Sequence, residues 1–393
     1  MMPIDIARAR AETPGTANVL HFNNAGSSLM PQPVLDATVD YLNLEAQIGG
    51  YEAADQQEAL IEHFYTAAAE MLNCDPDEIA FIENATRAWD MAFYAIPFQL
   101  GDRILTARAE YASNVIAFLQ MAEQRGVSVE VIPSEETGEL SVSALREMMD
   151  DNVRLIAMTH VPTNGGLVNP AAEVGTVAQE AGVLYLLDAC QSVGQMPVDV
   201  QAIGCDMLST TGRKYLRGPR GTGFLYVRRE VIPVLEPPML DLHAAQWTAP
   251  DQFITRDDAR RFENWETNYA GKVGLATALD YAMGWGLDAI YARVQDLASS
   301  LRACLRDIPG VTVTDIGMEQ CGIVTFMVAG HPASEIQQTL AQQAINITTS
   351  STSSTRFDME ARGLALIVRA SVHYYNDEAE VARFCAAIRE IAG

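Results

Sequence analysis

Between residues 77 and 227 the sequence alternates short apolar runs with longer stretches in which apolar residues recur at helical spacing. This alternation predicts a largely parallel sheet that is covered by helices on both faces. The expected strands cover residues 78–82, 103–106, 127–132, 155–159, 183–187, 207–209 and 222–227. The expected helices cover residues 87–96, 114–125, 143–149 and 170–181.

A second region with a different pattern begins near Gly271. Helices are expected over 273–286, 288–308, 332–343 and 378–391, and strands over 311–313, 322–328 and 364–370. Asp288 is a plausible N-cap of the second helix, and the Ser/Thr-rich residues 348–355 are expected to form a loop. The pattern predicts a smaller α+β domain. We assign residues 20–268 to a large domain, and residues 1–19 together with 269–393 to a small one.

Composition excludes several classes of function. The net charge of −25 argues against a nucleic-acid partner, which would need a Lys/Arg excess on one face. No apolar run approaches 18 residues, so no membrane span is expected, and the first 15 residues lack an apolar signal core. The six cysteines are scattered without a CxxC pair, which favours reduced thiols and a cytoplasmic location.

Lysine is scarce: Lys214 and Lys272 are the only lysines among 26 basic residues. Lys214 lies in a glycine-punctuated turn directly after an apolar run. A lysine amine can lose its proton and attack a carbonyl, whereas an arginine cannot. Lys214 is therefore a candidate for a Schiff base, and the alternative is an isolated surface lysine in a basic loop.

Polar side chains follow several expected strands, at the edge where open α/β sheets bind ligands. Ala85 and Thr86 open a helix whose N-terminus would favour a phosphate, although helix capping alone also explains them. Tyr111 could stack on a ring or pack in the core. Asp188 ends an apolar strand and needs a partner, such as a protonated pyridine nitrogen. A metal is the rival partner, but no His or Glu cluster supports it. Together with Lys214, these groups meet the requirements of pyridoxal 5'-phosphate (PLP).

Several short motifs between residues 188 and 223 follow one another in a specific order. They are Asp188-Ala189-Cys190-Gln191, Pro197-Val198-Asp199-Val200, Gly204-Cys205-Asp206, Thr211-Gly212-Arg213-Lys214 and Gly218-Pro219-Arg220-Gly221-Thr222-Gly223. In this order they resemble the class V aminotransferase family of fold-type I PLP enzymes, which includes cysteine desulfurases, kynureninase and isopenicillin N epimerase. The resemblance extends from about Phe22 to Tyr375. It implies an α/β fold in which a large PLP-binding domain has a mostly parallel seven-stranded sheet and a smaller α+β domain lies at the C-terminus.

The resemblance also implies a role for each matching position. Lys214 matches the catalytic lysine that holds PLP as a Schiff base, Asp188 the partner of the pyridine nitrogen, and Arg369 the arginine that binds the substrate α-carboxylate, where a bidentate pair is physically favourable. Thr267 matches a position that contacts the phosphate of the neighbouring subunit, which implies a homodimer with shared active sites. The remaining matches are Ala85, Thr86, Thr211 and Arg213 for the phosphate, Tyr111 for stacking on the ring, Gln191 for the phenolate oxygen, and Asn164 near the ring oxygen and the substrate carboxylate.

The sequence departs from the desulfurase pattern at several positions. Arg213 and Tyr111 stand where desulfurases commonly carry histidine, and Glu266 stands where they carry glycine. Desulfurases also need a nucleophilic cysteine on a mobile loop, and residues 348–369 contain none. Serine cannot replace a thiolate in persulfide chemistry. A persulfide-forming desulfurase is therefore disfavoured.

Other segments are most similar to the branch that contains isopenicillin N epimerase and hercynylcysteine sulfoxide lyase. In that branch an amino acid substrate joins PLP as an external aldimine, and Lys214 would then remove its α-proton to leave an α-carbanion. Loss of a sulfur-bearing β-substituent is the favoured outcome, with transamination as the alternative and epimerisation or racemisation after it. Arg87 and Arg217 could bind a distal acidic group of the substrate, and residues 350–355 could form a lid, although salt bridges and an ordinary connection explain them as well. The segments that resemble this epimerase and lyase branch are residues 22–26, 49–52, 110–111 and 261–263.

Overall fold

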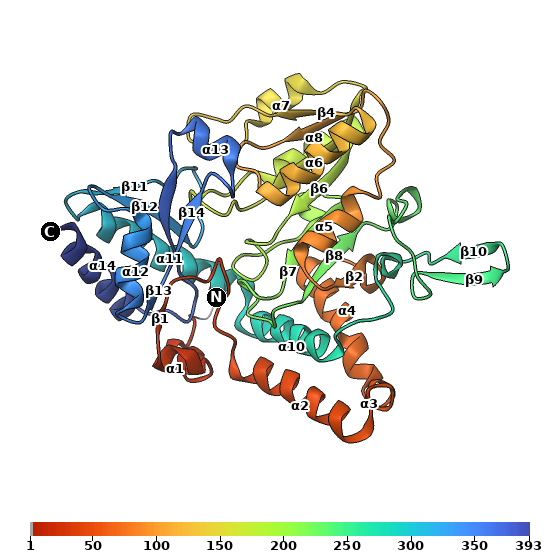
Figure 1. Ribbon diagram of the computed structural model, residues 1–393, viewed down its shortest axis with the longest axis horizontal. Helices are drawn as coiled ribbons and strands as arrows, with labels where there is room; N and C mark the ends of the chain where they lie inside the picture. Colours follow the sequence, from red (N-terminus) through yellow and green to blue (C-terminus); the bar gives the residue numbers. More distant parts are fainter. Residues whose placement is uncertain (1–2) are drawn as a thin grey trace.

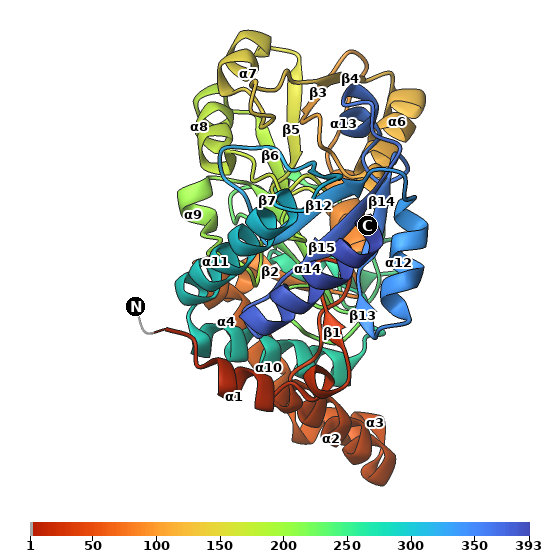
Figure 2. The ribbon, with the colours of Figure 1, turned by 90° about the vertical axis from the view of Figure 1, so that its left-hand side faces the viewer.

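The computed structural model describes residues 3–393, and its largest element is a seven-stranded sheet (Figures 1 and 2). Its strands are β2 (Ile79–Ile82), β3 (Arg103–Thr106), β4 (Ser128–Val131), β5 (Val153–Thr159), β6 (Leu184–Asp188), β7 (Met207–Thr211) and β8 (Gly223–Val227). They are ordered β2-β8-β7-β6-β5-β3-β4. Strand β8 is antiparallel to β2 and β7, and all other neighbours are parallel. The predicted mostly parallel seven-stranded sheet is confirmed.

The central strands β5 to β8 are almost entirely buried on both faces, as in sheets covered by helices on both sides, whereas the edge strand β4 is partly exposed. On β6, Tyr185 and Leu187 pack into one hydrophobic cluster, whereas Leu186 packs into a second cluster on the opposite face. The connecting helices are α5 (Ala85–Phe93), α6 (Ala112–Arg125), α7 (Val142–Met148), α8 (Ala171–Ala181) and α9 (Val200–Ile203). Helices α6 and α8 end at Gly126 and Gly182, whose positive φ angles of 72° and 66° suit glycine at a helix C-terminus.

A second, antiparallel sheet lies in the C-terminal part of the chain. Its strands are ordered β11-β12-β15-β14, with the bounds β11 (Val311–Val313), β12 (Ile323–Val328), β14 (Thr348–Ser351) and β15 (Leu366–Ser371). The helices of this part are α10 (Tyr269–Trp285), α11 (Leu287–Arg306), α12 (Ala333–Ala341), α13 (Arg356–Ala361) and α14 (Glu378–Ala392).

The chain crosses between the two parts near its N-terminus. Strand β1 (Leu20–His21) pairs with β13 (Ile345–Asn346), and α10 packs against α2 (Gln32–Ile48) and α4 (Glu58–Leu72). The division at residues 19/20 and 268/269 stays a prediction. The remaining elements are α1 (Ile6–Ala11), α3 (Gly50–Gln56) and the hairpin β9 (Ala245–Ala249) and β10 (Gln252–Thr255), which projects from the body in Figure 1.

Two local predictions were wrong. Residues 348–351 form strand β14 rather than a loop, because they pair with β15 and extend the small sheet; Thr348 lies opposite Arg369. Asp288 does not cap α11, because Gly286 occupies the N-cap position. Asp288 lies in the first turn, where its negative charge interacts favourably with the helix dipole. Within residues 3–393, no helix has the length and apolar character needed to cross a membrane.

Candidate active site

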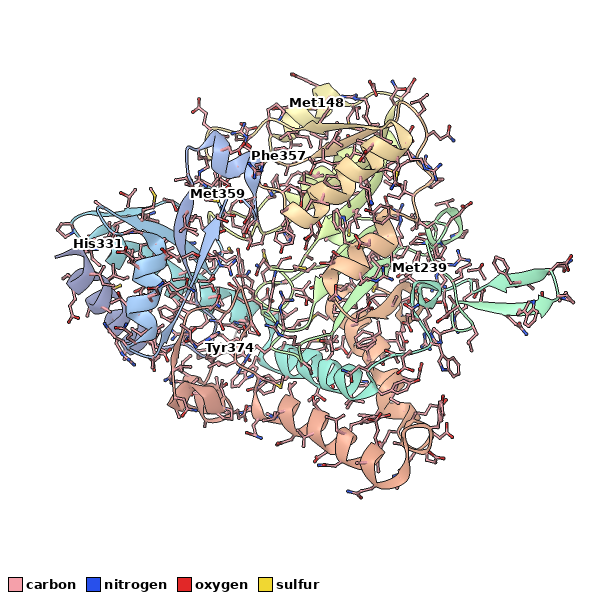
Figure 3. All side chains as sticks on the ribbon, in the orientation of Figure 1. Met148, Met239, His331, Phe357, Met359 and Tyr374 are labelled. Atoms are coloured by element: carbon pink, nitrogen blue, oxygen red, sulfur yellow. The ribbon has the colours of Figure 1, made fainter. Side chains whose placement is uncertain are left out.

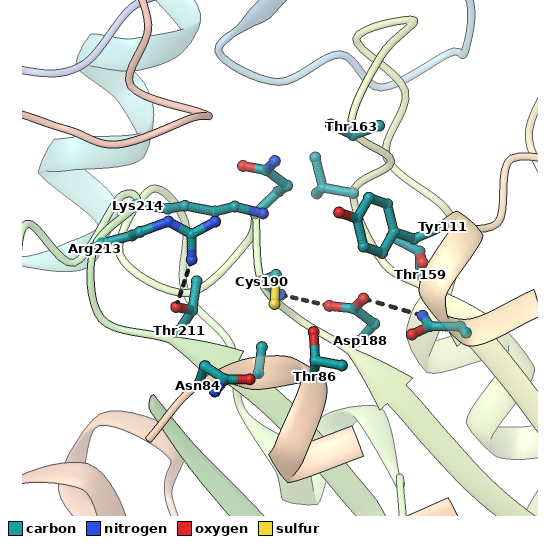
Figure 4. A pocket seen from close by; sticks show the side chains of 14 residues that line it. Asn84, Thr86, Tyr111, Thr159, Thr163, Asp188, Cys190, Thr211, Arg213 and Lys214 are labelled. Atoms are coloured by element: carbon teal, nitrogen blue, oxygen red, sulfur yellow. Dashed lines mark hydrogen bonds between the residues drawn. The ribbon is translucent and has the colours of Figure 1, made fainter. Parts of the chain in front are cut away.

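A pocket lies at the carboxyl ends of β5, β6 and β7, between the N-terminal ends of α5 and α6 (Figure 4). The structure brings all predicted site residues into its lining except Asn164, Thr267 and Arg369. The lining residues are Asn84, Ala85, Thr86, Tyr111, Asn114, Thr159, Val161, Thr163, Asp188, Cys190, Gln191, Thr211, Arg213 and Lys214.

One end of the pocket is suited to a phosphate. Ala85 and Thr86 are the first two residues of α5, where backbone N–H groups have no intrahelical acceptor and the helix dipole favours an anion. Opposite them, Arg213 donates from Nη1 to Thr211 Oγ1 over 3.0 Å, which holds the guanidinium beside this end. Arg87 does not line the pocket; its Nε is paired with Glu83 at 3.3 Å, so the salt-bridge alternative is the one observed.

The other end carries Asp188, which is 5% exposed and ends β6. Its Oδ1 accepts from the backbone N–H of Cys190 (2.9 Å), and its Oδ2 accepts from Asn114 Nδ2 (3.1 Å). The ring of Tyr111 lies above this carboxylate in Figure 4. Gln191 donates from Nε2 to Ala25 O (3.1 Å), while its Oε1 is buried without a partner among the described residues.

Lys214 extends from the loop after β7 into the middle of the pocket (Figure 4). Burial lowers the pKa of its amine from the ordinary value of 10.5, and the charges of Arg213 and Arg369 act in the same direction, while Asp188 opposes them. Within residues 3–393, its Nζ makes no hydrogen bond. The amine is thus left available to a ligand.

Arg369 and Asn164 lie behind the pocket wall. Arg369, on β15, donates from Nη1 to Thr163 O (2.9 Å) and Thr163 Oγ1 (2.5 Å), and burial lowers its pKa to about 10. Asn164 Oδ1 accepts from Thr355 Oγ1 (2.8 Å). In the described part of the chain, Arg369 Nε and Asn164 Nδ2 are buried without partners. Both side chains therefore retain donors for a further group on the Thr163 side.

Thr267 lies in a separate hollow that is also lined by Gly221, Asn264 and Glu266. One subunit alone does not bring it to the other predicted cofactor-binding residues. The expectation that it reaches the phosphate of a neighbouring subunit stays a prediction.

Arg217 does not face the pocket. It is 1% exposed and donates to Leu29 O (2.9 Å), Tyr374 Oη (2.6 Å) and Thr13 Oγ1 (2.5 Å). Tyr374, labelled in Figure 3, lies at the C-terminal end of α10, where its ring is 5.9 Å from that of Trp285. The idea that Arg217 binds the substrate is wrong: its guanidinium instead ties the turn after Lys214 to the N-terminal and C-terminal segments.

Sequence reasoning missed several residues around Asp188, chiefly Asn114, Thr159, Thr163 and Cys190, which line the pocket, and the neighbouring buried Glu110. Thr159 and Thr163 could have been found from the sequence. Thr159 ends β5 and Thr163 comes soon after it, just as Asp188 ends β6. Asn114 lies in the first turn of α6, and only the placement of that helix in the fold brings its side chain to the end of β6.

The residues present fit PLP. The helix N-terminus with Arg213 suits its phosphate, Asp188 its ring nitrogen, and Gln191 Oε1 and Asn164 Nδ2 are buried polar atoms with unused hydrogen-bonding capacity. Lys214 supplies an amine with no competing protein partner.

A sequence model of the aminotransferase class-V family matches residues 20–384. The chain belongs to the class V aminotransferase family. Among its relatives, a probable cysteine desulfurase of Methanothermobacter thermautotrophicus is 30% identical over 392 residues, which are 98% of this chain and 97% of the relative. A cysteine desulfurase of Yersinia pestis is 30% identical over 404 residues, covering 99% of both chains.

Solved structures of this family agree with the fold. The apo structure of a cysteine desulfurase from Thermococcus onnurineus has a TM-score of 0.93 at 26% identity and covers 100% of this chain and 99% of that chain. A complex of the cystine C–S lyase C-DES with its product cysteine persulfide has a TM-score of 0.87 at 25% identity, covering 96% and 99%. A lysine variant of C-DES carries glycine covalently linked to its PLP cofactor, with the same TM-score and identity. This class V protein is a PLP-dependent enzyme.

Proposed function

We propose that this class V enzyme is a carbon–sulfur lyase that performs β-elimination on a sulfur-bearing amino acid. The observation that carries the proposal is the segment 348–369, which contains hydroxyl side chains but no cysteine. The segment is docked next to the pocket: Ala112 N donates to Ser354 O over 2.9 Å, and Thr355 Oγ1 donates to Asn164. No thiol reaches the pocket from this side.

The cysteines elsewhere do not replace the missing nucleophile. Cys190 is the one cysteine in the pocket lining. Burial raises the pKa of its thiol well above 9, and the charge of Asp188 adds to this, so the thiol stays protonated. Cys321 and Cys385 are buried in the core at 0% and 1% exposure. A persulfide-forming desulfurase is therefore not supported, even though several relatives bear that name.

The pocket residues divide the work of such a reaction. Lys214, with its lowered pKa, is suited to remove the α-proton as a general base. Arg369 and Asn164 bind the substrate carboxylate, and the carboxyl group of Asp188 faces the place where the pyridine nitrogen would lie. Once bound, PLP supplies the electron sink for the carbanion. The C–S bond then breaks, a thiol leaves with a proton, and water converts the remaining enamine to pyruvate and ammonia.

The C-DES structures give a precedent for this chemistry on the same fold, because C-DES is described as a cystine C–S lyase. At 25% identity the precedent supports the reaction class without identifying the substrate.

We also propose a cytoplasmic homodimer. Thr267 lies outside the pocket of its own subunit, and large apolar side chains are exposed on the N-terminal helices and on the β9–β10 hairpin, as expected of a subunit interface. Light scattering of the purified protein tests the dimer. The proposed cytoplasmic location is supported by the six cysteines, which are all free, as expected in a reducing compartment. The exposed apolar residues are Leu35, Val39, Leu42, Ile48 and Tyr51 on the N-terminal helices and Trp247, Phe253 and Ile254 on the hairpin.

Incubation with cystine and a panel of cysteine conjugates tests the reaction. We expect pyruvate and ammonia to be released in equal amounts without any keto-acid acceptor. Product formation that depends on added keto acid would instead identify an aminotransferase, and inversion at the α-carbon without elimination would identify an epimerase. A persulfide that alkylation traps on the protein would restore the desulfurase assignment.

A further inference from the structure

Glu110 is a buried carboxyl group that the site description has so far left without a role. It follows β3 by a few residues, precedes Tyr111 directly, and is 1% exposed. Its side chain does not line the pocket. A buried carboxyl is costly unless its oxygens accept hydrogen bonds, so its surroundings indicate what it is for.

All donors to Glu110 are neutral groups, and three of the donor residues, Tyr111, Asn114 and Thr159, line the pocket. Oε1 accepts from the backbone N–H of Tyr111 (2.8 Å), from Asn114 Nδ2 (2.8 Å) and from the hydroxyl of Thr159. Oε2 accepts from Thr159 N (2.9 Å) and Thr106 Oγ1 (3.2 Å). The carboxyl thus joins the ends of β3 and β5 to the first turn of α6.

Asn114 extends this connection to Asp188. Its Nδ2 donates to Glu110 Oε1 (2.8 Å) and to Asp188 Oδ2 (3.1 Å), so each hydrogen of one amide group is held by a different carboxyl. Thr159 lies opposite Asp188 in the β5–β6 pairing. Glu110 therefore touches the backbone of the ring-face residue and, through a single amide, the group that faces the ring nitrogen.

We propose that Glu110 is a positioning residue of the PLP site that holds the ring-stacking Tyr111 and the ring-nitrogen partner Asp188 in register through the Tyr111 backbone N–H and the Asn114 amide. The inference rests on PLP binding in this pocket and not on which reaction follows. A simple alternative is that Glu110 only stabilises the start of α6, where Tyr111 has no side-chain cap.

The Glu110→Gln variant separates these roles. Both oxygens of Glu110 accept from N–H groups, so either orientation of a glutamine amide places its NH2 against a donor. We expect the dissociation constant of PLP for the apoprotein to rise about tenfold, and the visible circular dichroism of the fully loaded protein to fall by half or more. Glu110→Asp, which keeps a carboxyl group with a shorter reach, should lie between the wild type and Glu110→Gln in both measurements.

Glu78→Gln is the matched control. Glu78 is also buried, at 5% exposure, and accepts from the backbone N–H groups of Asp75 (2.9 Å) and Arg229 (2.8 Å), but it lies at the other end of β2, away from the pocket. The Glu78→Gln variant should lower the thermal stability, as Glu110→Gln does, but it should leave the PLP affinity within twofold of the wild type. Equal PLP affinity and equal dichroism in the two variants would overturn the proposal.

Asn114→Ala tests the route. If Glu110 acts through the Asn114 amide, Asn114→Ala alone should weaken PLP binding, and adding Glu110→Gln to it should weaken binding by no more than a further threefold. Full additivity of the effects of Asn114→Ala and Glu110→Gln on PLP binding would overturn the route. A wild type that binds PLP but releases no pyruvate would refute the proposed lyase activity and leave this inference intact.

Discussion

The two lysines of the chain occupy two contrasting buried regions. Lys272 on α10 is 4% exposed; it donates to Tyr65 Oη over 2.7 Å and lies 4.1 Å from the centroid of the Tyr65 ring. Tyr65 in turn donates to Glu263. Lys214 lines the pocket, and within residues 3–393 its amine makes no hydrogen bond.

Burial lowers the pKa of both amines, so the pKa alone does not reveal which lysine is reactive. The difference lies in the partners. A phenol and aromatic faces already satisfy the ammonium of Lys272, whereas the protein leaves Lys214 free beside Asp188 and Cys190. A hydrogen-bond partner within the protein therefore marks the structural lysine, and the lack of one in a pocket marks the chemical lysine.

The largest expected effect is that of Lys214→Ala. The variant removes the amine that attaches the cofactor and takes the α-proton, so turnover should fall by at least about 10³-fold. The absorption band of the covalently attached cofactor should disappear while the far-ultraviolet circular dichroism stays unchanged. A Lys214→Ala protein that kept the band would show that Lys214 is not the lysine that attaches the cofactor.

The same contrast applies to two buried arginines and predicts the next largest effect. Arg302 donates from Nε to Asp315 Oδ2 (2.7 Å) and from Nη2 to Cys321 O (2.8 Å) and Ile323 O (2.7 Å), whereas Arg369 Nε is buried without a partner among the described residues. Arg369→Lys loses a bidentate partner for the substrate carboxylate, and KM should rise about 100-fold, or about 3 kcal/mol, with a smaller change in kcat. Arg302→Lys should lower the melting temperature and leave KM unchanged. The reverse pattern would exclude Arg369 as the carboxylate-binding residue.

Much of this site was accessible from the sequence because it depends on local signals. Strand ends could be placed by apolar runs, and residues after them, such as Asp188 and Lys214, meet at one edge of a parallel sheet whatever the details of packing. The scarcity of lysine singled out Lys214 before any fold was assigned.

The features that were missed depend on long-range contacts. Strand β14 is rich in serine and threonine and resembles a loop until β15 pairs with it. Arg217 adopts a positive φ of 62° and is buried, because groups up to 204 residues away satisfy its guanidinium. The link from Glu110 to Asp188 exists only once the fold places the first turn of α6, with Asn114, beside the end of β6.

The pH dependence of stability tests whether Glu110, like Lys214 in the pocket, lies in a buried environment that shifts its pKa. Burial raises the pKa of its carboxyl from 4.5 to about 7, and Asp188 adds to the shift. Between these pH values the native state holds a proton that the unfolded state has released, so stability falls as pH rises. The free energy of unfolding of the apoprotein, minus that of Glu110→Gln, should therefore decrease by up to about 3 kcal/mol from pH 4.5 to 7.5.

Chemical denaturation of both apoproteins at a series of pH values measures this difference, and the common contributions of all other groups cancel in the subtraction. A difference that stays constant with pH would mean that Glu110 is ionised in the folded protein throughout this range. Its hydrogen-bond donors would then outweigh the cost of burial.

The smallest expected effect is that of Lys272→Met, which completes the contrast. Methionine fills a similar volume, and Tyr65 keeps its hydrogen bond to Glu263, so the loss is limited to one buried hydrogen bond and the cation–π contacts. The free energy of unfolding should fall by about 2 kcal/mol. The absorption of bound PLP and KM should stay within twofold of the wild type, because no atom of Lys272 lines the pocket of Lys214. A loss of cofactor in Lys272→Met at unchanged stability would mean that this lysine serves the active site, and that a satisfied hydrogen bond does not distinguish a structural amine from a chemical one.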